Sequence, residues 1–123
     1  MSQPRPPKHF TLEPERDGDT VLVRLGGEFD LAAERYFEHT AGALGQAAQK
    51  IVVDLSGLTF IDSSGMRALL RLWETTREDG LDLAIVPGSA QVRHTMELTG
   101  VDRVLPIVKE APPGATPTLT ASD

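Results

Sequence analysis

The spacing of apolar and polar residues changes several times along the chain, and each spacing predicts one kind of element. Near the start, two short apolar segments flank the sequence Arg16-Asp17-Gly18-Asp19, which predicts a β-hairpin because Asp-Gly is a strong turn signal. Residues 51–55 are apolar on both faces except for Asp54, as expected of a central parallel strand. Strands are predicted over residues 10–13, 20–25, 51–55, 81–86 and 104–108, the last at a sheet edge because it contains Pro106.

Between the strands, apolar residues recur every three or four positions, which is the spacing of one buried helix face. Helices are predicted over residues 31–48, 64–79 and 90–98, with Asp30 and Ser89 as N-caps of the first and third, and with Gly80 and Gly100 beyond the ends of the second and third. The order β-β-α-β-α-β-α-β predicts an α/β fold. In it, a small, mixed, mostly parallel β-sheet of four or five strands carries helices packed mainly on one side.

The length of 123 residues is enough for one domain that buries a core without disulfides or metal. Residues 1–8 contain three prolines and almost nothing apolar, so we expect a flexible arm there. Residues 111–123 are rich in Pro, Thr and Ala and have no apolar period, so we expect a disordered tail. The folded domain is therefore predicted over residues 9–110.

The composition argues against several classes of protein. Without cysteine, the chain has no disulfide, no thiol nucleophile and no cysteine-bound metal. The net charge of -6 and the low aromatic content argue against nucleic-acid binding, which normally uses a basic stripe or stacked aromatic rings. No apolar run approaches the length of a membrane span and no secretion signal is visible, so we expect a cytoplasmic protein.

The sequence Asp62-Ser63-Ser64-Gly65 stands between an apolar segment and the helix predicted from Ser64. Its local chemistry fits two roles. Asp and Ser cap helices, because their side chains accept hydrogen bonds from free backbone N–H groups. A hydroxyl at a helix N-terminus can also accept a phosphate, because the backbone dipoles there favour an anion. Ser63 is expected just outside the helix and Ser64 within its first turn.

A serine hydrolase is the enzymatic alternative, and the sequence argues against it. The chain lacks a G-x-S-x-G nucleophile elbow, and no carboxylate stands at triad spacing from its histidines, which are His9, His39 and His94. We therefore expect no catalytic residue, no metal site and no cofactor. Arg67 and Arg71 lie one turn apart on the second predicted helix, either as a solvated face on which Arg71 pairs with Glu74 or as contacts to a partner.

Three segments of the chain resemble the signatures of one family. The run from Asp54 to Met66, Asp-Leu-Ser-Gly-Leu-Thr-Phe-Ile-Asp-Ser-Ser-Gly-Met, resembles the signature of STAS domains, specifically of the bacterial anti-sigma factor antagonists. The acidic segment Gly27-Glu28-Phe29-Asp30 resembles their second signature. Residues 98–105, Leu-Thr-Gly-Val-Asp-Arg-Val-Leu, resemble the third. The three matches occur in the family's order and span nearly the whole predicted domain.

The resemblance implies roles for individual residues. In that family the serine directly after the aspartate accepts a phosphate, so Ser63 is implied as the phosphoacceptor. Asp30 and Asp62 match positions that line the same surface, whereas without the family Asp30 would be a helix cap and Asp62 a solvated loop charge. The partner-binding surface that the resemblance implies consists of Asp30, Asp62, Ser64, Gly65 and Met66.

The resemblance also implies a function, that of an anti-sigma factor antagonist. Unphosphorylated, the protein would bind an anti-sigma factor that is also a serine kinase, and phosphorylation of Ser63 would release it. A serine phosphatase would restore the binding. ATP and Mg²⁺ belong to the kinase, so the protein itself would carry no cofactor. One alternative stays open, because some STAS domains are subunits of transporters or sensory scaffolds and have no kinase partner.

Overall fold

A computed structural model describes residues 5–108 of the chain. Its elements are β1 (Phe10–Asp17), β2 (Thr20–Phe29), α1 (Leu31–Gly45), β3 (Lys50–Ile61), α2 (Ser63–Glu78), β4 (Asp82–Val86), α3 (Ala90–Thr99) and a short 3₁₀ helix, η1 (Val101–Arg103). Residues 5–9 form neither helix nor strand. Residues 1–4 of the predicted arm and the predicted tail over residues 111–123 lie outside the described residues.

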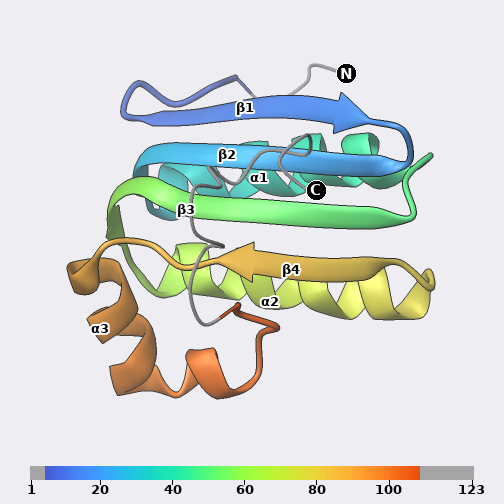
Figure 1. Ribbon diagram of the computed structural model, residues 1–123. Helices are drawn as coiled ribbons and strands as arrows, with labels where there is room; N and C mark the ends of the chain where they lie inside the picture. Colours follow the sequence, from blue (N-terminus) through green and yellow to red (C-terminus); the bar gives the residue numbers. More distant parts are fainter. Residues whose placement is uncertain (1–4, 109–123) are drawn as a thin grey trace.

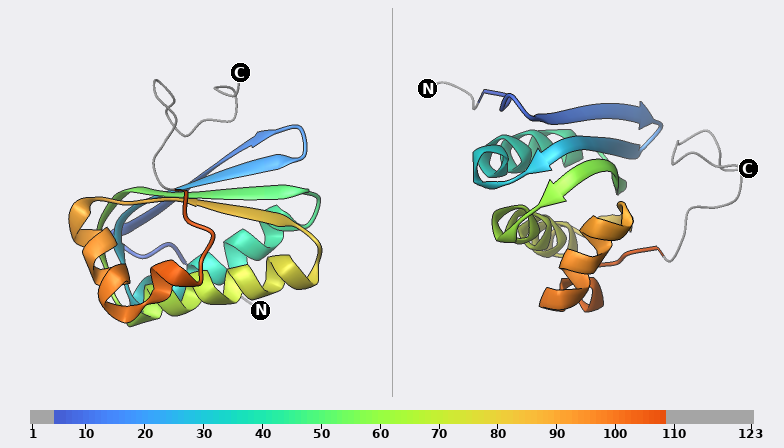
Figure 2. Two further views of the ribbon diagram at one scale, coloured as in Figure 1. Left: turned by 60° about the horizontal axis from the view of Figure 1, so that its bottom comes forward. Right: turned by 90° about the vertical axis from the view of Figure 1, so that its left-hand side faces the viewer.

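The strands form one mixed sheet in the order β1-β2-β3-β4. β1 and β2 form an antiparallel hairpin closed by the pair Asp17 and Thr20, so the predicted turn is confirmed. β2, β3 and β4 run parallel to one another, and β3 lies between two neighbours. α1 and α2 pack side by side against one face of the sheet (Figures 1 and 2). The predicted α/β fold, with a mostly parallel sheet and helices mainly on one side, is confirmed.

The carboxyl ends of the parallel strands meet at one edge of the sheet. β2 ends at Phe29 and β3 ends at Ile61, and these two residues are paired across the ladder. Because α1 and α2 begin directly after these strands, both helix N-termini lie at this edge, which is on the left in Figure 1 and faces the viewer in the right-hand panel of Figure 2. Binding sites of α/β proteins commonly lie beyond the carboxyl ends of parallel strands. We call this part of the molecule the carboxyl edge.

The prediction of a strand over residues 104–108 is wrong. Only an isolated parallel bridge joins Ile107 to Ile85, and the chain before it forms η1 and a turn. Pro106 explains why the bridge does not extend into a ladder, since proline has no backbone N–H to donate. The carbonyl of Pro106 still accepts a hydrogen bond from the N–H of Ile85 at 3.0 Å, which fixes the segment beside β4.

Other boundaries also differ from the prediction, since β1 continues past residue 13 to Asp17 and β2 continues past residue 25 to Phe29. β3 continues past residue 55 to Ile61, because its ladder with β2 shifts register instead of stopping. Gly57 permits this continuation, since a Cβ there would lie 2.8 Å from the carbonyl oxygen of Leu25. α1 ends at Gly45 instead of near residue 48, and residues 46–47 form a turn that leads back toward β3.

Aromatic rings fix the carboxyl edge to the core. The ring centroids of Phe10 and Phe29 are 5.0 Å apart, and those of Phe29 and Phe37 are also 5.0 Å apart. Phe29 and Phe37 are completely buried. Since Phe29 is the last residue of β2, its burial anchors the point at which the chain leaves the sheet and enters α1.

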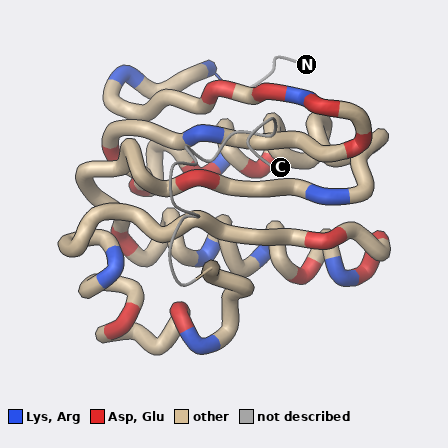
Figure 3. Tube along the Cα trace, viewed as in Figure 1, with Lys and Arg blue, Asp and Glu red and all other residues tan. Residues whose placement is uncertain are grey.

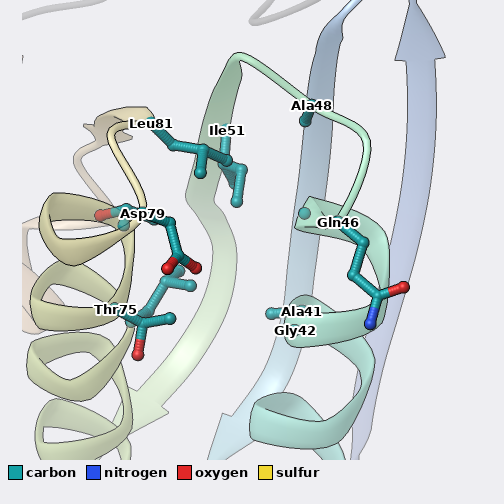
Figure 4. A pocket seen from close by; sticks show the side chains of 11 residues that line it. Ala41, Gly42, Gln46, Ala48, Ile51, Thr75, Asp79 and Leu81 are labelled. Carbon is teal, nitrogen blue, oxygen red and sulfur yellow. The ribbon is translucent and has the colours of Figure 1, made fainter.

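A groove of about 430 Å³ separates the C-terminal halves of α1 and α2, at the end of the molecule away from the carboxyl edge (Figure 4). Small residues on α1 leave this space open. A Cβ on Gly42 would meet no atom within 4 Å, whereas a Cβ on Gly45 would lie 2.9 Å from the side-chain Cδ1 of Ile51. The two glycines therefore differ in the room that they have for a side chain.

This difference predicts the effect of alanine at each position. Gly42→Ala should raise the free energy of unfolding by about 0.5–1 kcal/mol, because alanine loses less backbone entropy in a helix and has open space here. Gly45→Ala should gain less, because Ile51 must shift to accept the new methyl group. Urea denaturation of the two variants and the wild type measures both effects. A loss of stability in Gly42→Ala would contradict the packing described here.

Candidate functional site

Asp62 caps the N-terminus of α2. Its Oδ1 accepts hydrogen bonds from the backbone N–H groups of Ser64 at 2.8 Å and Gly65 at 3.2 Å. α2 therefore begins at Ser63, one residue earlier than predicted, and Ser63 lies in the first turn instead of just outside the helix. The reason is that Asp62 has the extended backbone and the acceptor oxygen that an N-cap requires.

The two serines differ in exposure. Ser63 is exposed, whereas Ser64 is buried with 8% of its surface accessible. A modifying enzyme can reach the hydroxyl of Ser63 more readily than that of Ser64. This supports the choice of Ser63 over Ser64, although the geometric reason given by the sequence, that Ser63 precedes the helix, is wrong.

Asp30 lacks the capping hydrogen bond that the sequence predicts for it, whereas Asp62 takes the capping role that was one of its two alternatives. Asp30 stands at the N-cap position of α1, but its side chain makes no capping hydrogen bond; its backbone carbonyl accepts from the N–H of Ala33 at 3.0 Å. Asp62, expected as a solvated charge, is the residue that caps a helix. The carboxylate of Asp30 is therefore not engaged in capping α1.

The fold brings Asp30 and Asp62 to neighbouring positions. Each directly follows one member of the paired residues Phe29 and Ile61, and the N–H of Asp62 donates to the carbonyl of Phe29 at 3.2 Å. Gly65 makes this close approach possible, because a Cβ there would lie 2.5 Å from the same carbonyl oxygen. The predicted acidic surface around Ser63 thus comes from two strand ends that are held together by backbone contacts.

Gly65 and Met66 support this surface from beneath. Both are buried, and Met66 is 5% exposed. The Sδ of Met66 accepts a hydrogen bond from the Thr99 hydroxyl at 3.4 Å, which links the start of α2 to the end of α3. Of the five residues predicted to bind a partner, Asp30 and Asp62 are therefore the accessible ones, whereas Ser64, Gly65 and Met66 are buried beneath them.

An ion-pair cluster joins α1 to α2 beside the site. Arg67 binds Glu34 with two hydrogen bonds, Nε to Oε2 at 2.9 Å and Nη2 to Oε1 at 3.1 Å. Arg71 binds Oε2 of Glu34 at 3.2 Å and Oε2 of Glu38 at 2.8 Å. The predicted pairing of Arg71 with Glu74 is therefore wrong, because the acidic residues of α1 lie closer and offer two partners.

The sequence did not identify Glu34, which is 7% exposed and forms ion pairs with both Arg67 and Arg71. The spacing of charged residues on two predicted helices could have indicated this ion-pair cluster. Glu34 and Glu38 are four residues apart on one predicted helix, and Arg67 and Arg71 are four apart on the next. Two such pairs of opposite charge can face each other when the helices pack side by side, but the sequence does not show which faces meet.

The STAS family model matches residues 11–111 of the chain. The chain belongs to the STAS domain family. A protein of Mycobacterium tuberculosis H37Rv that is named an anti-anti-sigma factor is 34% identical over 104 residues, covering 80% of this chain and 70% of that protein. An anti-sigma F factor antagonist of Paenibacillus polymyxa is 27% identical over 108 residues, covering 80% of this chain and 86% of its own length.

A solved structure is similar over most of this STAS domain. The crystal structure of an anti-sigma factor antagonist from Mycobacterium paratuberculosis superposes with a TM-score of 0.71 at 25% identity, covering 93% of this chain and 91% of that chain. The predicted family is thus confirmed by sequence and by fold.

Exposed apolar side chains lie next to the acidic residues of the STAS domain's carboxyl edge. Leu31, the first residue of α1, is 67% exposed, and Phe60, two residues before Asp62, is 43% exposed. Polar and apolar groups side by side are typical of surfaces that bind other proteins. Over residues 5–108, Lys and Arg are interspersed with Asp and Glu along the elements (Figure 3), without the basic stripe of a nucleic-acid interface.

Two other kinds of site are not seen in residues 5–108. No helix there has the length and apolar character that crossing a membrane requires. The same residues contain no cluster of three or more histidine, aspartate or glutamate side chains that could hold a metal ion.

The ion-pair cluster predicts a pH dependence of stability. The hydrogen bonds from Arg67 hold the pKa of Glu34 below its ordinary value of 4.5, against the opposing effect of burial. A carboxylate whose pKa is lowered by folding stabilises the native state above its unfolded pKa, and this stabilisation is lost as the pH falls through the lowered value. Wild type should therefore exceed Glu34→Gln in stability by a constant amount above pH 4.5, and this difference should shrink below pH 4.5.

Denaturant unfolding of both proteins in steps between pH 7 and pH 3 measures this difference. A gap between wild type and Glu34→Gln that stays constant throughout that range would show that the carboxylate of Glu34 is not stabilised by its arginines.

Proposed function

We propose that this STAS domain is an anti-sigma factor antagonist whose binding is switched by phosphorylation of Ser63. Unmodified, it binds an anti-sigma factor that is also a serine kinase and so frees the sigma factor. The kinase transfers the γ-phosphoryl group of ATP to the Oγ of Ser63, with ADP and the hydroxyl proton leaving, and the modified protein dissociates. A serine phosphatase hydrolyses the phosphate and restores binding. The observation that carries the proposal is the exposed hydroxyl of Ser63 in the first turn of α2, beside Asp62 and close to Asp30.

The position of Ser63 lets the fold tolerate a phosphate. The residue is exposed, and the positive end of the helix dipole favours negative charge at the first turn by about 0.3–1 kcal/mol. Phosphorylation should therefore leave the core and the sheet unchanged. The switch then acts at the surface and needs no rearrangement of the domain.

The same position explains why a phosphate would end binding. It adds about -1.5 to -2 charges at neutral pH, next to the carboxylate of Asp62 and near that of Asp30. A partner that covers this surface must then desolvate the new charge and fit its bulk. Leu31 directly follows Asp30 in the chain and Phe60 precedes Asp62 by two residues, and both are exposed, so a partner that covers the two aspartates would also lose the apolar contact that these side chains offer.

The proposal has further parts that follow from the family's function. The protein catalyses no reaction and holds no cofactor, since ATP and Mg²⁺ enter with the kinase. It works in the bacterial cytoplasm, where sigma factors act. The functional unit is the domain over residues 9–110.

Phe60 should anchor the partner. Phe60→Ala should weaken binding of the kinase roughly tenfold, because truncating an aromatic side chain in an interface commonly costs more than 1 kcal/mol. Val104→Ala is a matched control, since Val104 is similarly exposed at 47% but follows η1 instead of a strand end at the carboxyl edge. Isothermal titration with the kinase measures both affinities. An unchanged affinity in Phe60→Ala, or an equal loss of affinity in the two variants, would contradict the anchoring role of Phe60.

A pull-down from the native bacterium tests the proposed function as a whole. Immobilised wild type and Ser63→Asp proteins are exposed to the same lysate, and the retained proteins are identified by mass spectrometry. The proposal expects a small ATP-binding kinase on the wild type and not on Ser63→Asp. Recovery of a transporter or a sensory complex on both proteins would reject the kinase switch in favour of a scaffold role.

A further inference from the structure

Arg67 lies on the same face of α2 as Ser63, one helical turn further along. The two residues are four positions apart, which is the spacing of neighbours on a helix surface. The side chain of Arg67 is 47% exposed, so an anion at the start of the helix can reach it. This residue has no part in the cap that Asp62 provides.

Contacts on two sides hold the guanidinium of Arg67 over the first turn of α2. Its Nε and Nη2 donate to the two carboxylate oxygens of Glu34, and its Nη2 also donates to the Oγ of Ser64 at 3.4 Å. Within residues 5–108, these are the hydrogen bonds that the group makes, so the two hydrogens on Nη1 are uncommitted. Arginine has five N–H donors in a planar fork, and it can bind two anions at once.

We propose that Arg67 binds the phosphate of phospho-Ser63 through Nη1 while Nε and Nη2 keep their contacts with Glu34. The proposal rests on the proposed function, since it concerns the modified form of the same site. Glu34 acts as a positioning residue, because it aims the guanidinium at the first turn before any phosphate is present. Arginine and a phosphate monoester form short, charge-assisted hydrogen bonds.

The neighbouring charges favour Arg67 over the other arginine of the cluster. Arg71 is eight residues from Ser63, which is a rise of about 12 Å along the helix. It is also held by Glu34 and Glu38. The carboxylates of Asp62 and Asp30 repel a phosphate on Ser63 and so direct it toward Arg67, whereas the carboxylate of Glu34 stays paired with Nε and Nη2 of that arginine.

In the phosphorylated state, the protein itself would supply the group that binds the phosphate. Arg67 would hold the phosphate against α2 and fix its orientation on the surface that the partner must cover. It would also favour the dianion, because a nearby cation lowers the pKa of an acid. Release of the partner would then remain complete at slightly acidic pH, at which a free phosphoserine takes up a proton.

The test uses protein in which phosphoserine is incorporated at position 63 during translation, so that no kinase is needed. Phosphorus NMR follows the second pKa of the phosphate between pH 4 and pH 8 in otherwise wild-type protein, in Arg67→Gln and in Arg71→Gln. We expect the pKa to be lower by about one unit in the wild type than in Arg67→Gln, and we expect Arg71→Gln to match the wild type. His39 on α1 and His94 on α3 are unchanged in all three proteins, so they contribute equally to each titration.

Equal pKa values in wild type and Arg67→Gln would overturn the proposal. Equal increases in both variants would also overturn it, since they would show a general effect of net charge instead of a contact. Amide spectra of each variant confirm that it is folded before the titration. If no kinase acts on Ser63, the proposed function fails, but this titration still decides whether Arg67 binds the phosphate.

Discussion

Ser63→Asp should bind the anti-sigma kinase more than a hundredfold more weakly than the wild type, while keeping its fold. For a partner held at micromolar affinity, this loss is about 3 kcal/mol. The new carboxylate would stand in the first turn of α2 beside Asp62, on the surface that the kinase must desolvate. Because the helix N-terminus accepts negative charge, the free energy of unfolding should change by less than about 1 kcal/mol.

Ser63→Asn is the matched control for this prediction, since it has the shape of aspartate without the charge. It should keep most of the wild-type affinity, and Ser63→Ala should bind fully but resist release. Titration calorimetry with the kinase compares the four proteins. If Asn weakened binding as much as Asp, bulk would be the cause and the electrostatic account would be wrong.

Gly65→Ala should cause the largest loss of stability at the site. The added Cβ would lie 2.5 Å from the carbonyl oxygen of Phe29, 2.8 Å from Cγ1 of Ile61 and 2.9 Å from Cγ of Phe29. None of these atoms can yield easily, because Phe29 is completely buried and its carbonyl accepts the N–H of Asp62. Overpacking of this kind costs about 1–3 kcal/mol, and the backbone contact favours the upper end.

The comparison with Ser63→Ala separates this effect from a general sensitivity of the segment. Ser63 is exposed and lies two residues away, so its truncation should change the free energy of unfolding by less than about 0.5 kcal/mol. Denaturant unfolding of both variants gives the result. A Gly65→Ala protein as stable as the wild type would mean that the strand ends do not approach as closely as described.

Much of the fold was predictable because local patterns and long-range packing agree. The run over residues 51–55 is apolar on both faces except for Asp54, and it forms the part of β3 that lies between two parallel neighbours. The hairpin turn was marked by Asp17 and Gly18. The last segment was not predictable from its apolar residues alone, because Pro106 limits its pairing with β4 to one bridge.

The closeness of the candidate site residues was predictable from the family resemblance, whereas their hydrogen bonds were not. The sequence singled out Asp30, Asp62 and Ser63, and the fold places them together. Which aspartate caps a helix depends on the direction of its side chain, and no local pattern encodes this direction. The partners of Glu34 are 33 and 37 residues away in the chain, so they depend on how α1 packs against α2.

We expect a phosphate on Ser63 to end binding at the surface of an unchanged fold. The most direct measurement phosphorylates the protein with the kinase recovered from the native cell, locates the phosphate by mass spectrometry, and titrates the product against the same kinase while amide NMR spectra are recorded. We predict one phosphate on Ser63, an affinity for the kinase that is reduced more than a hundredfold, and spectral shifts confined to residues 29–31 and 60–70. Full phosphorylation of Ser63→Ala, undiminished binding of the phosphorylated protein, or shifts throughout the central strands would contradict it.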